Sequence, residues 1–167
     1  MPFAFGFGQG YYSATKECHM KFDDSVRLVL ERKGTEVFSV APDATVYDAL
    51  RQMAQYDIGA LLVMENRHAV GIFSERDYAR KVILLGRSSA ETSVEEVMSP
   101  ASCVAPTDSI DSCLHLMTSA RVRHLAVIDM GEVAGMISIG DLVNWMISAQ
   151  ADTIDHLHQY ISSAYPG

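Results

Sequence analysis

The spacing between apolar residues changes along the chain, and each spacing predicts a helix or a strand. Residues 44–56 carry apolar side chains three and four positions apart, which is the spacing of one helix face. Residues 60–64 are wholly apolar, as in a strand that is buried on both faces. We predict, in order, a strand at 37–40, a helix at 44–56, strands at 60–64 and 70–73 separated by a turn at 65–68, and a helix at 74–81. This order is β-α-β-β-α.

The same pattern occurs twice. When the chain is shifted by 64 residues, positions 38–81 align with 102–145 without a gap and share ten identities. Ordinary residue usage would give about three. The shared residues include Val40-Ala41-Pro42 with Val104-Ala105-Pro106, and Gly71, Ser74 and Asp77 with Gly135, Ser138 and Asp141. A repeat of this length indicates a supersecondary unit that is used twice.

Shorter segments flank the two units. Residues 24–33 predict a helix that ends at Gly34, residues 86–92 form a polar linker, and the last helix is expected to run past Trp145 towards Tyr160. A unit of about 45 residues buries its own faces poorly, so we expect the two copies to pack together with a cleft on their pseudo-two-fold axis. The predicted fold class is α+β, built from two tandem β-α-β-β-α repeats with flanking helices. The predicted division is a tail at 1–23, a first repeat with its leading helix at 24–85, a linker at 86–93, a second repeat at 94–148, and a C-terminal helix and tail at 149–167.

Composition narrows the possible functions. The 167 residues carry a formal net charge of -8, which is the opposite of the usual balance in a nucleic-acid binder. No apolar run approaches the roughly 18 residues of a membrane span. Cys18, Cys103 and Cys113 are odd in number and lack Cys-x-x-Cys spacing, so we expect reduced thiols and a cytoplasmic location. The apolar start precedes the first basic residue, Lys16, which argues against a secretory signal, and Met20 is a candidate natural start.

Each repeat has a Ser-x-x-Asp corner between a strand and a helix, at Ser74 and Asp77 and at Ser138 and Asp141. One interpretation is a capping box, in which the serine caps the helix and the acid reaches back. A second interpretation is a ligand site, because a helix start favours phosphate and a carboxylate can accept two adjacent ribose hydroxyls. The two interpretations are compatible, and the corners alone do not separate them.

Basic residues gather around these corners. Arg76, Arg80 and Lys81 follow the first corner, and Arg121, Arg123 and His124 precede the middle strand of the second repeat. Most such residues are solvated surface charges. The matched positions of the first repeat, however, hold Asp57, Gly59 and Ala60, so the two clefts are expected to bind phosphate unequally. The strand ends Ser39-Val40 and Cys103-Val104 are candidates for contacting an adenine ring.

The pattern resembles a tandem pair of cystathionine β-synthase (CBS) domains over roughly residues 35–148. The resemblance is carried by Val40-Ala41-Pro42, Gly71 to Asp77, Val97-Met98-Ser99-Pro100, Arg123 to Val127 and Gly135 to Asp141. It implies an adenine nucleotide in the cleft, AMP first and NAD or ATP as alternatives, with no metal. Ala126 departs from the proline that the family often has there. The predicted nucleotide-binding residues are Ser39, Val40, Ser74, Arg76, Asp77, Cys103, Val104, Arg123, His124, Ser138, Ile139 and Asp141.

We therefore expect a regulatory module that binds a nucleotide, shifts its conformation and catalyses nothing. We expect a homodimer formed through the CBS faces and the C-terminal helix, and a separate effector protein, with no nucleic acid or membrane as partner. One alternative is a purely structural dimerisation module with an empty cleft. A nucleotide-processing enzyme is a weaker alternative, because no nucleophile-base set or Gly-rich phosphate loop is visible. Cys18-His19 and His156-x-His158 have weak metal-ligand spacing and lie outside the repeats.

Overall fold

A computed structural model describes residues 23–149 of the chain. The expectations for Met20, Cys18, most of the N-terminal tail and the chain beyond residue 149 lie outside the described residues. The elements, in chain order, are α1 (Val26–Lys33), β1 (Ser39–Val40), α2 (Val46–Tyr56), β2 (Ala60–Glu65), β3 (His68–Ser74), α3 (Glu75–Asp77), the π-helix η1 (Tyr78–Ile83), the 3-10 helix η2 (Val94–Glu96), β4 (Cys103–Val104), α4 (Ile110–Ala120), β5 (His124–Asp129) and β6 (Glu132–Ser138). Residues 139–149 form a further helix.

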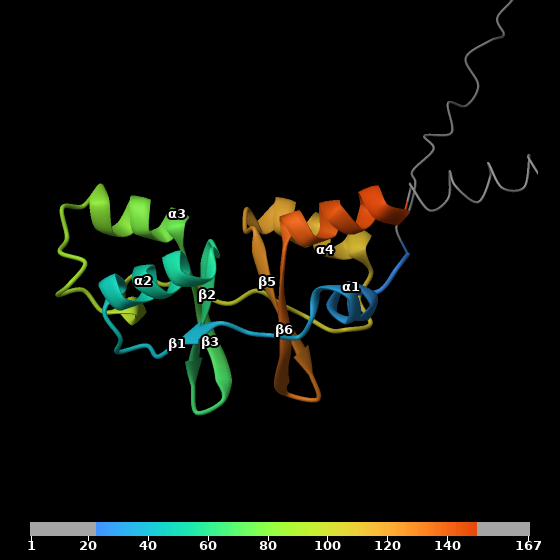
Figure 1. The fold of residues 1–167 in the computed structure, drawn as a ribbon, viewed down its shortest axis with the longest axis horizontal. Coiled ribbons are helices and arrows are strands. Elements are labelled where there is room, and N and C mark those ends of the chain that lie inside the picture. The colour runs from blue at the N-terminus through green and yellow to red at the C-terminus, as the bar shows by residue number, and fades with distance from the viewer. Residues whose placement is uncertain (1–22, 150–167) are drawn as a thin grey trace, which may run out of the picture.

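The strands form two three-stranded sheets of identical topology, which stand next to each other at the centre of the molecule with helices on their outer sides (Figure 1). In each sheet the first strand is parallel to the second, and the second is antiparallel to the third. Leu62 pairs with Ile72 in one sheet and Ala126 with Met136 in the other, and both sheets have a register shift one residue later. The 64-residue repeat of the sequence is thus a repeat of backbone register.

The hairpin turns repeat as well. Asn66 and Arg67 connect β2 to β3 with positive φ angles of 48° and 68°. Met130 and Gly131 connect β5 to β6 with 49° and 87°. Two consecutive residues with positive φ characterise the two-residue turn that matches the twist of an antiparallel pair. The predicted turn at 65–68 is therefore tighter than expected, because β3 already begins at His68.

The leading helix packs on the second repeat, although it precedes the first in the chain (Figure 1). Val26, Val29 and Leu30 of α1 are buried in the same core as Leu125 and Ile137. The sequence division grouped this helix with residues 24–85, because periodicity shows that a face is buried but not against what.

The segment before the second repeat docks on the first in the same way. Val94 and Val97 lie in the core of the first repeat. The backbone amide of Val94 donates to the carbonyl of Ala44 in the first repeat. In the same way, the amide of Val26 donates to the carbonyl of Asp108, which is the matched position of the second repeat. Each repeat is therefore completed by the segment that precedes the other.

A small third core joins the two sheets. Its buried members are Ala60, Leu62, Ile72 and Ala126, and they come from both repeats. Side chains that alternate with these point into the separate cores of the two repeats, as expected for strands that are buried on both faces. The contact between the repeats is therefore apolar but formed by few large side chains.

Candidate functional site

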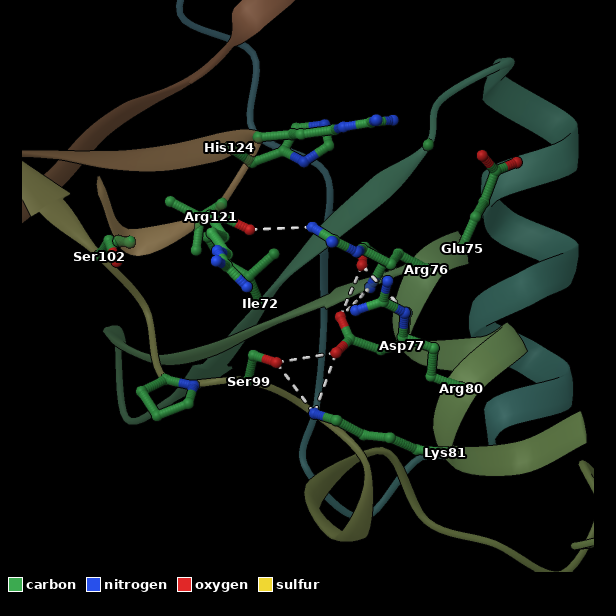
Figure 2. A pocket seen from close by; sticks show the side chains of 16 residues that line it. Ile72, Glu75, Arg76, Asp77, Arg80, Lys81, Ser99, Ser102, Arg121 and His124 are labelled. Atoms are coloured by element: carbon green, nitrogen blue, oxygen red, sulfur yellow. Dashed lines mark hydrogen bonds and ion pairs between the residues drawn. The ribbon is translucent and has the colours of Figure 1, made fainter. Parts of the chain in front are cut away.

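A cavity of about 630 Å³ lies between the two repeats, beside the first Ser-x-x-Asp corner. Its lining combines the first repeat, the segment between η2 and β4, and the segment that enters β5 (Figure 2). Ser74, Arg76, Asp77, Arg123 and His124 are the predicted site residues that line it. Both repeats thus supply polar side chains to a single cavity.

The first corner forms the predicted capping box. The backbone amide and the hydroxyl of Ser74 both donate to Oδ2 of Asp77, over 3.1 and 2.5 Å, and the amide of Asp77 donates back to the serine oxygen over 3.3 Å. The other carboxylate oxygen accepts the Ser99 hydroxyl at 2.7 Å and pairs with Lys81 Nζ at 2.9 Å. Figure 2 shows Ser99 and Lys81 converging on this carboxylate.

These contacts determine the charge of Asp77. Burial acts to raise the pKa of its carboxyl, but hydrogen bonds from Ser74, Lys81 and Ser99 outweigh burial and leave the pKa below its ordinary value. Asp77 is therefore ionised at neutral pH, and both of its oxygens already have partners within the chain.

The second corner has the same capping contacts but a different neighbour. The amide and hydroxyl of Ser138 donate to Oδ2 of Asp141 over 2.7 and 2.8 Å. Lys33 Nζ of α1 lies 2.6 Å from the same oxygen. Asp141 lines a separate cavity of about 240 Å³, and neither Asp141 nor Ser138 lines the larger one. The two corners that the sequence treated alike thus face different cavities.

Cations concentrate at the larger cavity. Arg76 Nη1 donates to the carbonyl of Arg121 over 2.9 Å, which links the two repeats (Figure 2). Lys81 Nζ also donates to the carbonyls of Val97 and Met98 over 2.8 and 3.0 Å, so this lysine is held in place. Within the described residues, no hydrogen bond or ion pair holds the guanidinium groups of three lining residues: Arg80, Arg121 and Arg123.

Local backbone conformation positions three of these cations. Arg80 and Lys81 belong to the π-helix η1, where the predicted helix at 74–81 continues after three α-helical residues. A π-turn is rare and often occurs at functional sites. Arg121 ends α4 with a φ of 55°, and Asp57 ends α2 with a φ of 53° at the matched position.

His124 lies at the start of β5, where the cavity meets the interface between the repeats. Burial lowers the pKa of His124, and the nearby charges of Lys33 and Arg123 lower it further, whereas Asp141 and Asp77 act to raise it. The net shift is downwards, so the imidazole is neutral at pH 7. It can accept a proton when an anion enters the cavity.

The remaining predicted residues lie elsewhere. Ser39 and Cys103 are exposed, Val40 is half-buried and Val104 is buried at the parallel strand pairs, and none of them is among the cavity-lining residues. Ile139 lines a smaller cavity of about 180 Å³ that also includes Arg76 and Arg123. The predicted adenine contacts thus lie outside the lining of the larger cavity and stay predictions.

Several lining residues were absent from the predicted set. Arg80, Lys81 and Arg121 were visible as part of the basic cluster, and charge alone would have included them. Ser99, Pro100 and Ser102 lie between η2 and β4, and the Val-Met-Ser-Pro motif was the signal for the first two. Among residues 23–149, no group of three or more His, Cys, Asp or Glu side chains is placed to hold a metal ion. No helix in the described part of the chain is long and apolar enough to cross a membrane.

Comparison with known proteins places this geometry in context. Residues 33–83 and 94–148 match the family model of the CBS domain, once for each repeat. The chain is 39% identical over 129 residues to the mitochondrial CBS domain-containing protein CBSX3 of Arabidopsis thaliana, covering 74% of this chain and 63% of that protein. The chain therefore spans less than two thirds of the length of this relative.

Solved structures share the fold. A CBS-domain protein from Burkholderia ambifaria MC40-6, named for a role in signal transduction, is 46% identical with a TM-score of 0.73, over 76% of this chain and 96% of that one. A more distant structure, the CBS domain protein PAE2072 from Pyrobaculum aerophilum complexed with AMP, is 20% identical with a TM-score of 0.64, over 71% and 89% of the two chains. That second likeness supports the architecture alone.

Proposed function

This chain belongs to the CBS domain family and is a tandem-repeat regulatory module, and from that premise we propose that it binds an adenine nucleotide in the 630 Å³ cavity. The phosphate would lie among the arginine side chains at the entrance to β5. Ser74 and the Asp77 carboxylate would lie on the opposite wall. We further propose that the chain binds its ligand without converting it.

One observation carries this proposal: a strongly acidic chain gathers cations from both repeats around a single cavity. The formal net charge of the chain is -8, yet five basic side chains line the cavity: Arg76, Arg80, Lys81, Arg121 and Arg123. Like charges repel one another at such short range, which costs free energy unless an anion occupies the space between them. An anion with several oxygens, such as a phosphate, suits guanidinium donors.

AMP is the proposed first ligand, with NAD and ATP as alternatives. The AMP complex of the Pyrobaculum protein shows that this fold can hold AMP in another chain. A specific observation favours a second candidate function, a structural module without ligand. Both oxygens of Asp77 already have partners within the chain, so the corner is satisfied without a ligand. Ribose hydroxyls would therefore have to replace Ser99 or Lys81.

A thermal unfolding experiment separates the two candidates. A ligand that binds only the folded chain, at about 100 times its Kd, adds about 2.7 kcal/mol to the free energy of unfolding. We expect AMP to raise the melting temperature of the natural chain and to raise that of Arg80→Ala much less. Arg51→Ala removes an exposed arginine on α2 whose ion partner is Asp48, and this control should respond like the natural chain. If none of AMP, NAD and ATP raises the melting temperature, nucleotide binding is contradicted and the structural module is favoured.

Regulation follows from the position of the cavity between the repeats. A ligand can change the angle between two repeats only by binding one arrangement better than another. The repeats meet through a small apolar core and through polar contacts such as Arg76 with the Arg121 carbonyl. We propose that nucleotide binding shifts this contact and that a separate effector protein senses the change. We propose the cytoplasm as its compartment, although the Arabidopsis relative is mitochondrial.

We also propose that a second copy of this chain is a partner. Apolar side chains are exposed at the end of η1 and in the turn after it, at Ile83, Leu84 and Leu85, and on the helix of residues 139–149, at Ile139, Val143 and Ile147. Ile83 and Ile147 are 64 residues apart and thus occupy matched positions. Both helices run along the same side of the molecule (Figure 1). A patch that recurs about a pseudo-two-fold axis suits a self-complementary dimer interface. The predicted contribution of the C-terminal helix beyond residue 149 lies outside the described residues.

A further inference from the structure

The two Ser-x-x-Asp corners have diverged in charge. Basic residues around the first corner have no basic counterpart around the second. The matched pairs are Arg76 with Gly140, Arg80 with Asn144, Lys81 with Trp145, and Arg121 with Asp57. At the first corner Asp77 is neutralised by Lys81 of its own flanking helix, and the matched residue of the second repeat cannot do this.

A lysine from a distant segment takes that place at the second corner. Lys33, at the end of α1, places its Nζ 2.6 Å from Oδ2 of Asp141 and donates to the carbonyl of Met136 over 3.0 Å. Its side chain is 34% exposed and that of Asp141 is 21% exposed. The ammonium group therefore binds a strand carbonyl and the corner carboxylate at the same time.

Packing fixes the position of Lys33. Val26, Val29 and Leu30 of the same helix are buried in the core of the second repeat. The Leu30 side chain lies directly on Gly135 of β6, where an added Cβ would be 2.7 Å from a leucine methyl group. Trp145 Nε1 donates to Asp24 over 2.9 Å at the other end of the helix. The helix cannot move away without opening the core, so its lysine remains at the corner.

This arrangement opposes a ligand at the second corner. Ribose hydroxyls that approached Asp141 would have to displace a charged, partly buried partner from its carboxylate. Hydrogen bonds to charged groups are stronger than neutral ones, so the exchange is unfavourable. In support, burial acts to raise the pKa of Asp141, but hydrogen bonds from Lys33 and Ser138 leave it below its ordinary value.

We propose that Lys33 acts as an internal ligand of the second corner and restricts the chain to one nucleotide, which binds in the cavity beside Asp77. The inference rests on the proposed nucleotide binding and adds its stoichiometry and the residue that sets it. Lys33 lines the cavity of about 240 Å³ beside Asp141, between α1 and the helix of residues 139–149. Without the lysine, this cavity offers a ribose acceptor and a single other cation, Arg32, in place of the basic cluster around Asp77.

Equilibrium dialysis with labelled AMP tests the proposal by counting molecules bound per chain at saturation. We expect one for the natural chain. Lys33→Met keeps most of the aliphatic stem but removes the charge, and it should take up a second AMP at least tenfold more weakly than the first. Lys33→Arg retains the charge and should remain at one AMP per chain.

The outcomes separate the two proposals. Two AMP molecules on the natural chain, or a single one on Lys33→Met, would overturn the role of Lys33 while nucleotide binding stands. No AMP on either chain would overturn nucleotide binding and this inference with it. Circular dichroism of each variant confirms that it is folded, and Lys33→Ala provides a second variant if the methionine packs poorly.

Discussion

Individual side chains at the cavity combine charge with unusual backbone geometry. Arg121 carries a guanidinium group at a left-handed position, where a residue with a Cβ is under strain. Asp57 occupies the matched left-handed position at the end of α2, away from the larger cavity. Because glycine adopts this conformation freely, substitution to glycine removes either side chain without disturbing the helix end. The two positions therefore provide a matched pair of variants.

Arg121→Gly tests the contribution of one cavity cation. We expect AMP affinity to fall by about tenfold, on the order of 1.4 kcal/mol, because a charged donor to the phosphate is lost. Thermal stability should be unchanged or slightly higher, because strain at the left-handed position is relieved. Asp57→Gly should show the same stability effect with unchanged affinity. Isothermal titration calorimetry gives the affinities, and equal affinity for both variants would contradict the role of Arg121.

His124 gives the site a pH dependence. Its pKa is lowered from about 6.5, chiefly by burial, and the charges that face it are Lys33, Arg123, Asp141 and Asp77. An anionic phosphate favours the protonated imidazole and raises this pKa, so binding takes up protons, and the histidine's contribution to affinity grows as pH falls below neutral. Calorimetry in buffers of different ionisation enthalpy measures the uptake.

His124→Asn provides the control for this effect, because the phosphate of AMP also titrates near pH 6. The ligand contributes equally to both proteins, so the difference in proton uptake belongs to the histidine. Identical proton uptake by the variant and the natural chain would show that His124 does not titrate on binding.

Some elements pack against the repeat that is more distant in the sequence, and α1 is the clearest case. Leu30 of α1 contacts Gly135 of β6, although 105 positions separate them in the chain. Gly135→Ala should destabilise the chain by about 1–3 kcal/mol through overpacking. Leu30→Ala alone should cost about 2–5 kcal/mol through the cavity it leaves. The double variant should cost clearly less than the sum, because the alanine methyl fills part of that cavity.

Urea denaturation of the two single variants and the double variant measures this coupling, provided that unfolding is two-state. Additive costs would mean that the helix and the strand do not pack together. Gly71→Ala offers a comparison in the first repeat, where Met98 occupies the place of Leu30. We expect a comparable cost there, because the methionine side chain adapts its shape more easily than leucine, whereas the Ser99 carbonyl oxygen, 3.0 Å from the added Cβ, does not.

Periodicity predicted the elements better than their partners. The apolar spacing at α2 and the apolar run at β2 correctly predicted a helix and a strand, because the pattern of buried side chains in each element follows from its own sequence. The helix predicted at 74–81 is present, but from Tyr78 onwards it is the π-helix η1, and the apolar spacing did not distinguish a π-helix from an α-helix. The contact of Lys33 with Asp141 joins residues 108 positions apart, and no local pattern encodes it.

The molecule as a whole is a pair of similar halves with one asymmetric cavity. Strand register, bulges and hairpin turns all repeat at an interval of 64 residues. Charge does not repeat, so the fold is symmetric while the proposed binding is not. Sequence alone predicted unequal clefts from Asp57 and Gly59, but the placement of Asp141 outside the larger cavity required the structure. The predicted adenine contacts at Val40 and Val104 remain predictions.

The proposed dimer depends on the same two-fold relation. Leu84 and Leu85 are 77% and 62% exposed, and a water-exposed pair of leucines next to Ile83 is an apolar patch that a second copy would cover. Each leucine that becomes fully buried contributes about 1.5–3 kcal/mol to the free energy of association, and in a two-fold symmetric dimer every contact occurs twice. Leu84→Glu with Leu85→Glu should therefore convert a dimer into a monomer, as measured by light scattering after size exclusion. Arg51→Glu on the exposed face of α2 should leave the dimer intact, and a natural chain that elutes as a monomer would refute the proposed interface.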